Sequence, residues 1–206
     1  MYEILDWFAT NGQFVQIFAL VTGVVYMILQ IFQNRLMWYV DLLTAGAALM
    51  IALFNSDSGS WAPLWAQAVM NSYFIVMAVI GIFTWKRYSK LSDGALHVVR
   101  LHRKEGVTSA VIALVGAPLL CLILSLTNDP EPFADGLSMT FSIIAAWFLT
   151  RSHVEQWVMW IIADLLVIVL YANQGAWWMV ALYYCYIISS VIGYTHWRKT
   201  GTYVEA

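Results

Sequence analysis

The sequence predicts an all-α integral membrane protein with seven transmembrane helices. Seven long apolar runs nearly fill the 206 residues, and all ten Lys and Arg residues lie in alternate gaps between those runs or directly after the last run. With 62% hydrophobic and 11% charged residues, the chain has too little polar surface to cover a soluble globule. Because a span needs roughly 20 mostly apolar residues, we expect no soluble domain.

The basic residues give the expected orientation of the spans. In chain order the spans are Gln13–Phe32, Trp38–Phe54, Ala62–Trp85, Val107–Leu126, Gly136–Leu149, Glu155–Ala172 and Ala176–Trp197. The first, third and fifth gaps and the segment after the last span hold, respectively, Arg35; Lys86, Arg87, Lys90, Arg100, Arg103 and Lys104; Arg151; and Arg198 and Lys199. The positive-inside rule therefore predicts an external N-terminus and a cytoplasmic C-terminus. The external side collects the acids Glu3, Asp6, Asp57, Asp129, Glu131 and Asp135.

An internal repeat gives the expected domain organisation. The third span contains GIFTWKR (Gly81–Arg87), and the seventh contains GYTHWRK (Gly193–Lys199), so the two spans align without a gap. One helix face of the third span then reads Gln67, Asn71, Phe74, Ala78, Gly81 and Trp85, against Met179, Tyr183, Tyr186, Ser190, Gly193 and Trp197. Upstream, MWYVDLL (Met37–Leu43) resembles MWIIADLL (Met159–Leu166) with a one-residue insertion. Chance matching of short aromatic segments is the alternative.

A repeat of three spans needs a connecting span if both copies are to have the same orientation. The fourth span meets this need, which predicts a parallel 3+1+3 arrangement. We expect a first triple-helix bundle in residues 1–90, a basic loop and linker helix in 91–130, and a second triple-helix bundle in 131–206. Cys121 and Cys185 lie inside spans, and we expect two buried thiols rather than a disulfide or a metal site.

Two acids inside predicted spans are candidate functional residues, because an ionisable residue in a membrane normally faces a bundle interior or a wet cavity. Asp164 is nine residues beyond Glu155 and therefore near mid-membrane, whereas Asp41 is six residues after Arg35 and could be merely interfacial. The alignment of the two copies predicts that these acids occupy corresponding positions.

Aromatic residues surround the acids in the sequence. Trp157, Trp160, Ile168 and Tyr171 share a helical stripe with Asp164, and Trp38 precedes Asp41 by three residues. Aromatic walls with carboxylates suit a flat cationic ligand. An aromatic belt at the membrane interfaces is the expected role of another set: Trp7, Trp61, Trp85, Trp177, Trp178 and Trp197.

Two amides are one turn apart on the third span. Gln67 and Asn71 could orient a heterocycle or tie helices together. Gly81 and Gly193 are expected to allow close helix packing, and His97 and His102 to be solvated. The sequence has no Walker, zinc-ligand, nucleophile-elbow or dinucleotide motif, so we expect no enzyme activity, cofactor, metal or nucleic-acid partner.

The run from Leu149 to Trp160 reads L-T-R-x-x-x-E-x-W-x-x-W, and the whole chain resembles the PnuC-type vitamin transporters in span order. The resemblance implies two triple-helix bundles joined by a linker helix, as in the SWEET sugar transporters. It also implies facilitated diffusion of a vitamin precursor across a bacterial inner membrane. Family members transport nicotinamide riboside, thiamine, riboflavin or deoxynucleosides.

Asp41 and Asp164 indicate which substrate to expect. Nicotinamide riboside transporters resembling this chain tend to have Asn where it has Asp41 and Asp164, which favours the thiamine-transporting PnuT branch. The expected substrate-binding residues are Trp38, Asp41, Gln67, Asn71, Trp160, Asp164, Tyr183 and Tyr186. In this site Trp160 and Tyr186 stack on the substrate, and Asp164 pairs with it.

We expect a cytoplasmic kinase to trap the imported substrate by phosphorylation. The sequence leaves open whether the protein forms a homo-oligomer. The alternatives are a nicotinamide riboside transporter, a proton-coupled version of the same carrier, and a sensor or scaffold that transports nothing.

Overall fold

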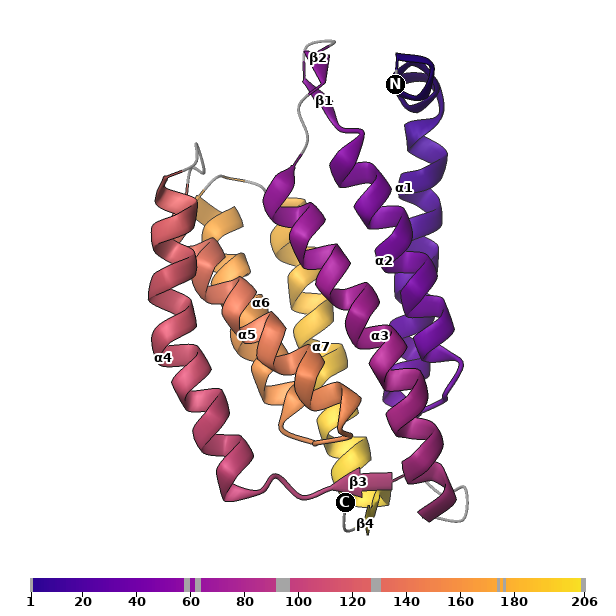
Figure 1. Cartoon of the computed structure of the whole chain (residues 1–206), viewed down its shortest axis with the longest axis vertical. Coiled ribbons are helices and arrows are strands. Elements are labelled where there is room, and N and C mark those ends of the chain that lie inside the picture. The colour runs from indigo at the N-terminus through magenta and orange to yellow at the C-terminus, as the bar shows by residue number, and fades with distance from the viewer. Residues whose placement is uncertain are drawn as a thin grey trace. The chain divides into compact units, whose positions relative to one another are not determined.

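The computed structural model of the chain describes residues 2–57, 60–61, 64–91, 97–126, 131–173, 175 and 177–204. Seven helices and four short strands make up this described part (Figure 1). The helices are α1 (Tyr2–Ile31), α2 (Met37–Leu53), α3 (Trp65–Leu91), α4 (Arg103–Ser125), α5 (Pro132–Thr150), α6 (Gln156–Asn173) and α7 (Trp177–Thr200). The seven predicted helices are therefore confirmed. Asp129 and the first residues of two predicted spans, Ala62 and Ala176, lie outside the described residues, as do the side chains of Asp6, Asp57, Trp61, Lys90 and Trp178.

Five of these helices are long and apolar enough to cross a membrane: α1 over Thr10–Ile31, α3 over Trp65–Arg87, α4, α5 and α6. The apolar helix α2 has only 17 residues. Four Tyr and three Trp residues reduce the hydropathy of α7. The chain is thus a multi-pass membrane protein, and α2 and α7 are the two helices outside this set of five.

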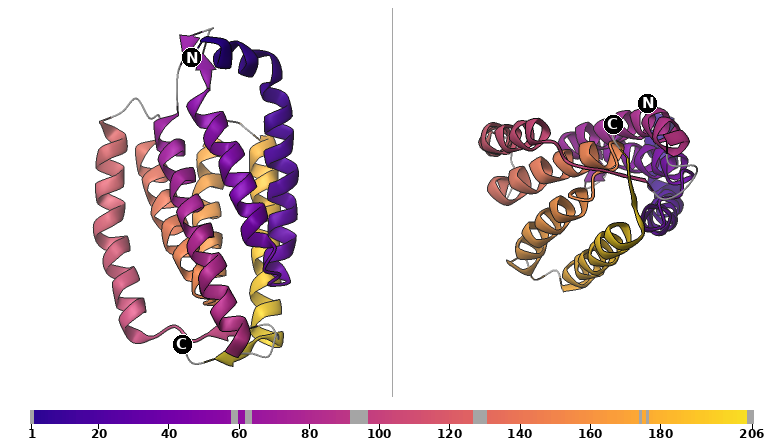
Figure 2. Two further views of the ribbon diagram at one scale, coloured as in Figure 1. Left: turned by 45° about the vertical axis from the view of Figure 1, so that its right-hand side comes forward. Right: turned by 90° about the horizontal axis from the view of Figure 1, so that it is seen from below.

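The chain divides into two compact units, Met1–Lys86 and Arg87–Ala206. In the first unit α1 packs along α2, and its first turns run across the direction of the rest of the helix (Figure 2, left). At the same end, strands β1 (Ser56–Asp57) and β2 (Ser60–Trp61) pair antiparallel. The far end of the unit is the turn between α1 and α2, which contains Arg35.

The second unit is a row of four helices in chain order. Helix α5 packs against α4 and α6, and α6 packs against α7, so that the row is seen end-on in Figure 2, right. Strand β3 (His97–Val99) precedes α4 and pairs in parallel with β4 (Thr202–Val204), which follows α7. This pairing ties the segment after the last helix to the segment before α4.

The turns that precede α2 and α6 have the same backbone form. In the first unit the left-handed residue is Gln33, with φ 51°, and in the second it is Ser152, with φ 58°. Neither is glycine, although a non-glycine residue with positive φ is uncommon. Each turn ends five residues later at a tryptophan, Trp38 in α2 and Trp157 in α6.

Each of these tryptophans packs on a glycine and a second tryptophan, an arrangement we call the Trp–Gly–Trp contact. A Cβ added to Gly81 would lie 2.4 Å from the Trp38 ring, whose centroid is 5.3 Å from that of Trp85 at an interplanar angle of 90°. The contact holds α2 against α3. Only glycine allows the indole to lie this close to the helix backbone.

The second unit repeats this contact between α6 and α7. A Cβ on Gly193 would lie 2.4 Å from the Trp157 ring, and the Trp157 and Trp197 centroids are 5.6 Å apart at 88°. The alignment of the third and seventh helices and the packing role of both glycines are confirmed. The predicted interfacial role of Trp85 and Trp197 is wrong, because both are 0% exposed.

The contacts also correct the alignment of the second and sixth helices. Trp157 corresponds to Trp38, since both occupy the same position in the contact, so no insertion is needed. Three residues further on, Asp41 corresponds to Trp160, and seven residues further on, Ala45 corresponds to Asp164. The prediction that the two acids occupy equivalent positions is therefore wrong. The sequence similarity of Met37–Leu43 and Met159–Leu166 had suggested a different alignment from the one that the packing shows.

Candidate functional site

Asp164 lies in the middle of α6, eight residues after the first residue of this 18-residue helix. It is buried, with 8% of its surface exposed. Its carboxylate interacts electrostatically with Tyr183 and Tyr186 on α7. The structure thus brings together three of the predicted site residues.

Three tyrosines form a continuous aromatic group, and two of them, Tyr183 and Tyr186, interact electrostatically with this acid. The Tyr171 and Tyr183 centroids are 5.7 Å apart at 33°, and the Tyr183 and Tyr186 centroids are 5.4 Å apart at 82°. Such tilted and edge-to-face pairs are favourable arrangements of aromatic rings. Asp135, from α5, interacts electrostatically with Tyr171 and Tyr183. A mid-helix carboxylate and three rings are therefore present in one unit, a combination suited to a flat cation.

Trp160 and Trp157 have different environments although they lie one turn apart. The half-buried Trp160 donates its indole N–H to Oε1 of Gln156 at 3.2 Å. Trp157 is 2% exposed and is used in the Trp–Gly–Trp contact. Of these two tryptophans of the predicted stripe, Trp160 is thus the one whose ring is not fully buried.

The predicted site residues of the first unit are spread over the two helices α2 and α3. Trp38 is 1% exposed beneath Gly81, so its ring has a packing role. The half-buried Asp41 interacts electrostatically with Tyr26 of α1, a residue that the sequence had not singled out. On α3, Asn71 donates Nδ2–H to the carbonyl oxygen of Gln67 at 2.8 Å, and the Gln67 side chain is exposed.

A second polar cluster, in the second unit, was not predicted. Nη1 of Arg151 is 2.9 Å from Oε1 of Glu105, and Nε2 of His153 is 3.3 Å from Oε2 of the same glutamate. Nδ1 of His153 is 3.0 Å from the carbonyl oxygen of Val99, and the Arg151 guanidinium lies 4.9 Å from the centroid of the Trp147 ring. Arg151, within the motif that carries the family resemblance, therefore holds the turn before α6 against α4.

Two histidines and two cysteines complete the predicted residues. His102 is exposed, as expected, but His97 is 3% exposed, because it lies in the paired strand β3. Both cysteines are free. Cys121 is half-buried, with Sγ 3.5 Å from the Phe133 carbonyl oxygen, whereas Cys185 is exposed on α7, so the expectation of two buried thiols is wrong for Cys185.

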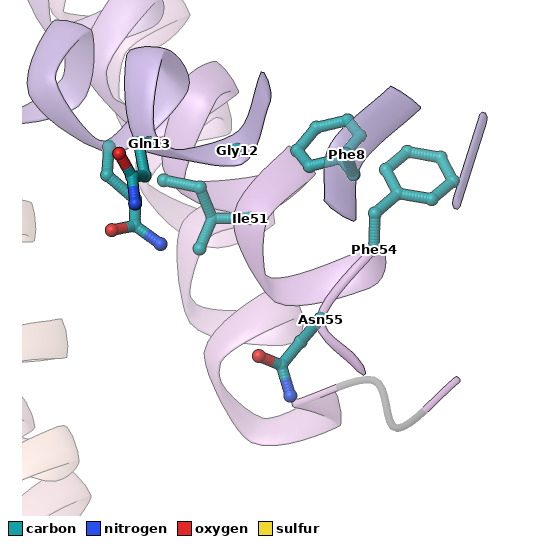
Figure 3. Close-up of a pocket in the computed structure, with 7 residues that line it drawn as sticks. Phe8, Gly12, Gln13, Ile51, Phe54 and Asn55 are labelled. Atoms are coloured by element: carbon teal, nitrogen blue, oxygen red, sulfur yellow. The ribbon is translucent and has the colours of Figure 1, made fainter. Parts of the chain in front are cut away.

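Each unit also contains an open cavity. A cavity in the first unit has a volume of about 230 Å³ and lies between α1 and α2. Figure 3 shows its lining, with Phe8 and Phe54 on one side of Ile51 and Gln13 on the other. The one in the second unit, of about 380 Å³, is lined by Val99, Arg100, Leu101, Val154, Glu155 and Tyr203.

Comparisons with known proteins give the family context. Residues 13–199 match the family described as nicotinamide mononucleotide transporter. The nicotinamide riboside transporter PnuC of Haemophilus influenzae is 31% identical over 122 residues, which cover 58% of this chain and 53% of that protein. That of Escherichia coli is 22% identical over 141 residues, which cover 56% and 59%. The chain thus spans just over half the length of these curated relatives.

A solved structure shares the fold. The crystal structure of the vitamin B3 transporter PnuC superposes with a TM-score of 0.68 at 18% sequence identity, covering 96% of this chain and 88% of that chain. At this identity the likeness shows the arrangement of helices alone.

Proposed function

Because the chain belongs to the nicotinamide mononucleotide transporter family, we propose that it carries a pyridine nucleoside, nicotinamide riboside, across the bacterial inner membrane. The charge of the candidate site supports the nucleoside over its phosphorylated form. Asp164 is buried at mid-helix, and the seven predicted spans contain no Lys or Arg. A pyridinium cation fits this environment, whereas a phosphate would be repelled by the carboxylate without any basic side chain to neutralise it.

Thiamine, the substrate that the sequence favours, receives no support from the comparisons. The two curated relatives described above are both named for nicotinamide riboside. The preference for thiamine also treated Asp41 and Asp164 as one paired substitution, but the two residues occupy different positions in their units. Nicotinamide riboside, first placed as the alternative, is therefore our main proposal.

In the proposed binding mode Asp164 pairs with the pyridinium, while Tyr183, Tyr186 and Trp160 provide aromatic surfaces. The hydroxyls of Tyr183 and Tyr186 can also hydrogen-bond to the ribose or the carboxamide. Gln67, Asn71 and Asp41 stay candidates for polar contacts in the first unit. Trp38 is left out, because its ring is packed on Gly81.

For the topology we propose the parallel 3+1+3 arrangement, with an external N-terminus and a cytoplasmic C-terminus. Its support is the repeated Trp–Gly–Trp contact and the restriction of Lys and Arg to alternate gaps. The first bundle then comprises residues 1–90, the loop and linker helix 91–130, and the second bundle 131–206.

We further propose that transport is facilitated diffusion and that a cytoplasmic kinase makes uptake unidirectional. The phosphorylated product carries a group that the spans cannot neutralise, so it does not return. Purified protein in liposomes, without kinase, should bring nicotinamide riboside to equal concentrations on both sides and stop. Accumulation above the outside concentration, driven by a proton gradient, would instead support the proton-coupled alternative.

The substrate assignment is tested with Asp164→Asn, which keeps the shape of the side chain and removes its charge. Loss of a charge-assisted interaction of roughly 1.5–3 kcal/mol should weaken nicotinamide riboside binding about ten- to a hundredfold, measured by calorimetry. Asp57→Asn, in the segment after α2, is the control and should bind like the wild type. Tighter binding of thiamine than of nicotinamide riboside by the wild type would overturn the proposal.

A further inference from the structure

The cavity between α1 and α2 lies at the end of the first unit opposite Arg35. Its α1 residues come from the first half of that helix, whose first turns run across the rest of it (Figure 2, left). The lining residues come from both helices and from the segment that follows α2: Phe8, Gly12, Gln13, Gln16, Ile51, Phe54 and Asn55. None of the candidate substrate-binding residues is among them.

The lining combines two kinds of surface. The rings of Phe8 and Phe54 are stacked, with centroids 5.0 Å apart at 28°, and form an apolar wall (Figure 3). Gln13 and Gln16 lie one turn apart on α1, and neither side chain makes a hydrogen bond to another described residue. These amides are therefore free to donate to and accept from a ligand.

In the sequence, acidic residues and no basic ones occur close to the α1 residues that line this cavity. Glu3 precedes Phe8 in the chain, whereas no Lys or Arg occurs before Arg35. Acidic residues around an opening increase the local concentration of cations and their rate of arrival. None of the described residues that line the cavity is charged, so the selectivity we expect comes from its amides and rings.

We propose that this cavity is a second, outer recognition site for the carboxamide-bearing ring of a cationic pyridine nucleoside. This inference rests on the proposed function and on the external position of the N-terminus. A carboxamide has one acceptor and two donors, which the amides of Gln13 and Gln16 can match. The aromatic ring packs against Phe8 and Phe54.

The size of the cavity limits what it holds. Sites that enclose a drug-sized ligand are roughly 300–1,000 Å³, whereas this cavity has a volume of about 230 Å³. It accommodates one substituted ring and leaves the ribose outside. Such a site captures substrate from dilute solution and releases it, so it lowers the concentration needed for half-maximal uptake and leaves the maximal rate unchanged.

Direct binding tests the site without reference to transport. Saturation-transfer NMR with free nicotinamide as the probe should show transfer to its ring protons in the wild type and in Asp164→Asn. The signal should be lost in the double variant Gln13→Met/Gln16→Met, which keeps side-chain length but cannot hydrogen-bond. Asn11→Leu is the matched control, because Asn11 lies on the same helix, bonds to the Trp7 carbonyl oxygen and does not line the cavity.

Uptake gives the second readout. In liposomes, Gln13→Met/Gln16→Met should raise the half-saturating concentration of nicotinamide riboside on the order of tenfold, as expected for two lost neutral hydrogen bonds, with an unchanged maximal rate. An NMR signal equal to that of the wild type in the double variant would refute the outer site, whether or not nicotinamide riboside is transported. Absence of transport with a signal that depends on Gln13 and Gln16 would instead refute the proposed function alone.

Discussion

The two units share a packing contact and differ in the residues that could carry chemistry. Trp38 on Gly81 and Trp157 on Gly193 have nearly the same geometry, with second tryptophans at 5.3 Å and 5.6 Å. In the same register, however, Asp164 corresponds to Ala45. The duplicated feature is therefore the helix packing, while the buried mid-helix acid belongs to one copy. Similar scaffolds thus need not provide a symmetric binding site.

The turns before α2 and α6 differ in their support. Each contains a left-handed residue, but the turn before α6 is held by Glu105 of α4 through Arg151 and His153. The N-terminal turn of α4 therefore has a structural role in the second unit.

The largest expected effect comes from adding one methyl group to either contact. In Gly81→Ala and Gly193→Ala the new Cβ would meet an indole at 2.4 Å, and the surrounding rings are fully buried. Overpacking of this kind costs about 1–3 kcal/mol. Thermal unfolding in detergent should show similar losses for the two variants, because the contacts are equivalent.

Gly46→Ala is the control for this pair. A Cβ at Gly46 meets nothing within 4 Å, so the change should stabilise α2 by about 0.5–1 kcal/mol through the higher helix propensity of Ala. Unequal losses, with one of the two glycine variants as stable as the wild type, would show that the contacts are not equivalent.

A smaller effect is expected from Glu105→Gln, which weakens the ion pair with Arg151. The pair is partly exposed, at 42% for Arg151 and 19% for Glu105, so the loss of stability should be about 1 kcal/mol. Glu155→Gln is the control, since the structure shows no ion pair for Glu155 among the described residues. If both variants unfold at the same temperature, α4 does not support the turn as we describe.

The smallest effect is expected at Asp41. Asp41 corresponds in position to Trp160 and lies near the N-terminal end of α2, which Arg35 precedes. Asp41→Asn should therefore change the affinity for nicotinamide riboside by less than about threefold, or under about 0.7 kcal/mol. Calorimetry of Asp41→Asn and Asp164→Asn, side by side, compares their affinities for nicotinamide riboside. A loss as large as that of Asp164→Asn would restore a site with one acid from each unit.

The helices could be predicted from the sequence because each requires only a local apolar run. The alignment of α3 with α7 was also accessible, since Gly81 and Trp85 repeat in the same spacing as Gly193 and Trp197. The matching of α2 with α6 failed, because MW occurs at Met37–Trp38 and Met159–Trp160 while the packing uses Gln156–Trp157. Sequence similarity over so few residues does not identify which tryptophan faces the glycine.

Contacts between distant segments could not be predicted. Glu105 and Arg151 are separated by 46 residues, and the parallel pairing of His97–Val99 with Thr202–Val204 joins segments more than 100 residues apart. In the sequence, His97 is simply part of a basic loop. Its burial depends on a strand partner that only the folded chain provides.

The left-handed residues offer a route to more stable variants for biochemical work. Ser152 is 0% exposed, has φ 58°, and has a hydroxyl without a hydrogen-bond partner among the described residues. Ser152→Gly relieves a conformation that costs an L-residue roughly 1–2 kcal/mol and removes a buried polar atom, which together exceed the entropy lost by glycine. A chain with glycine at 152 should therefore survive purification in shorter-chain detergents that unfold the wild type.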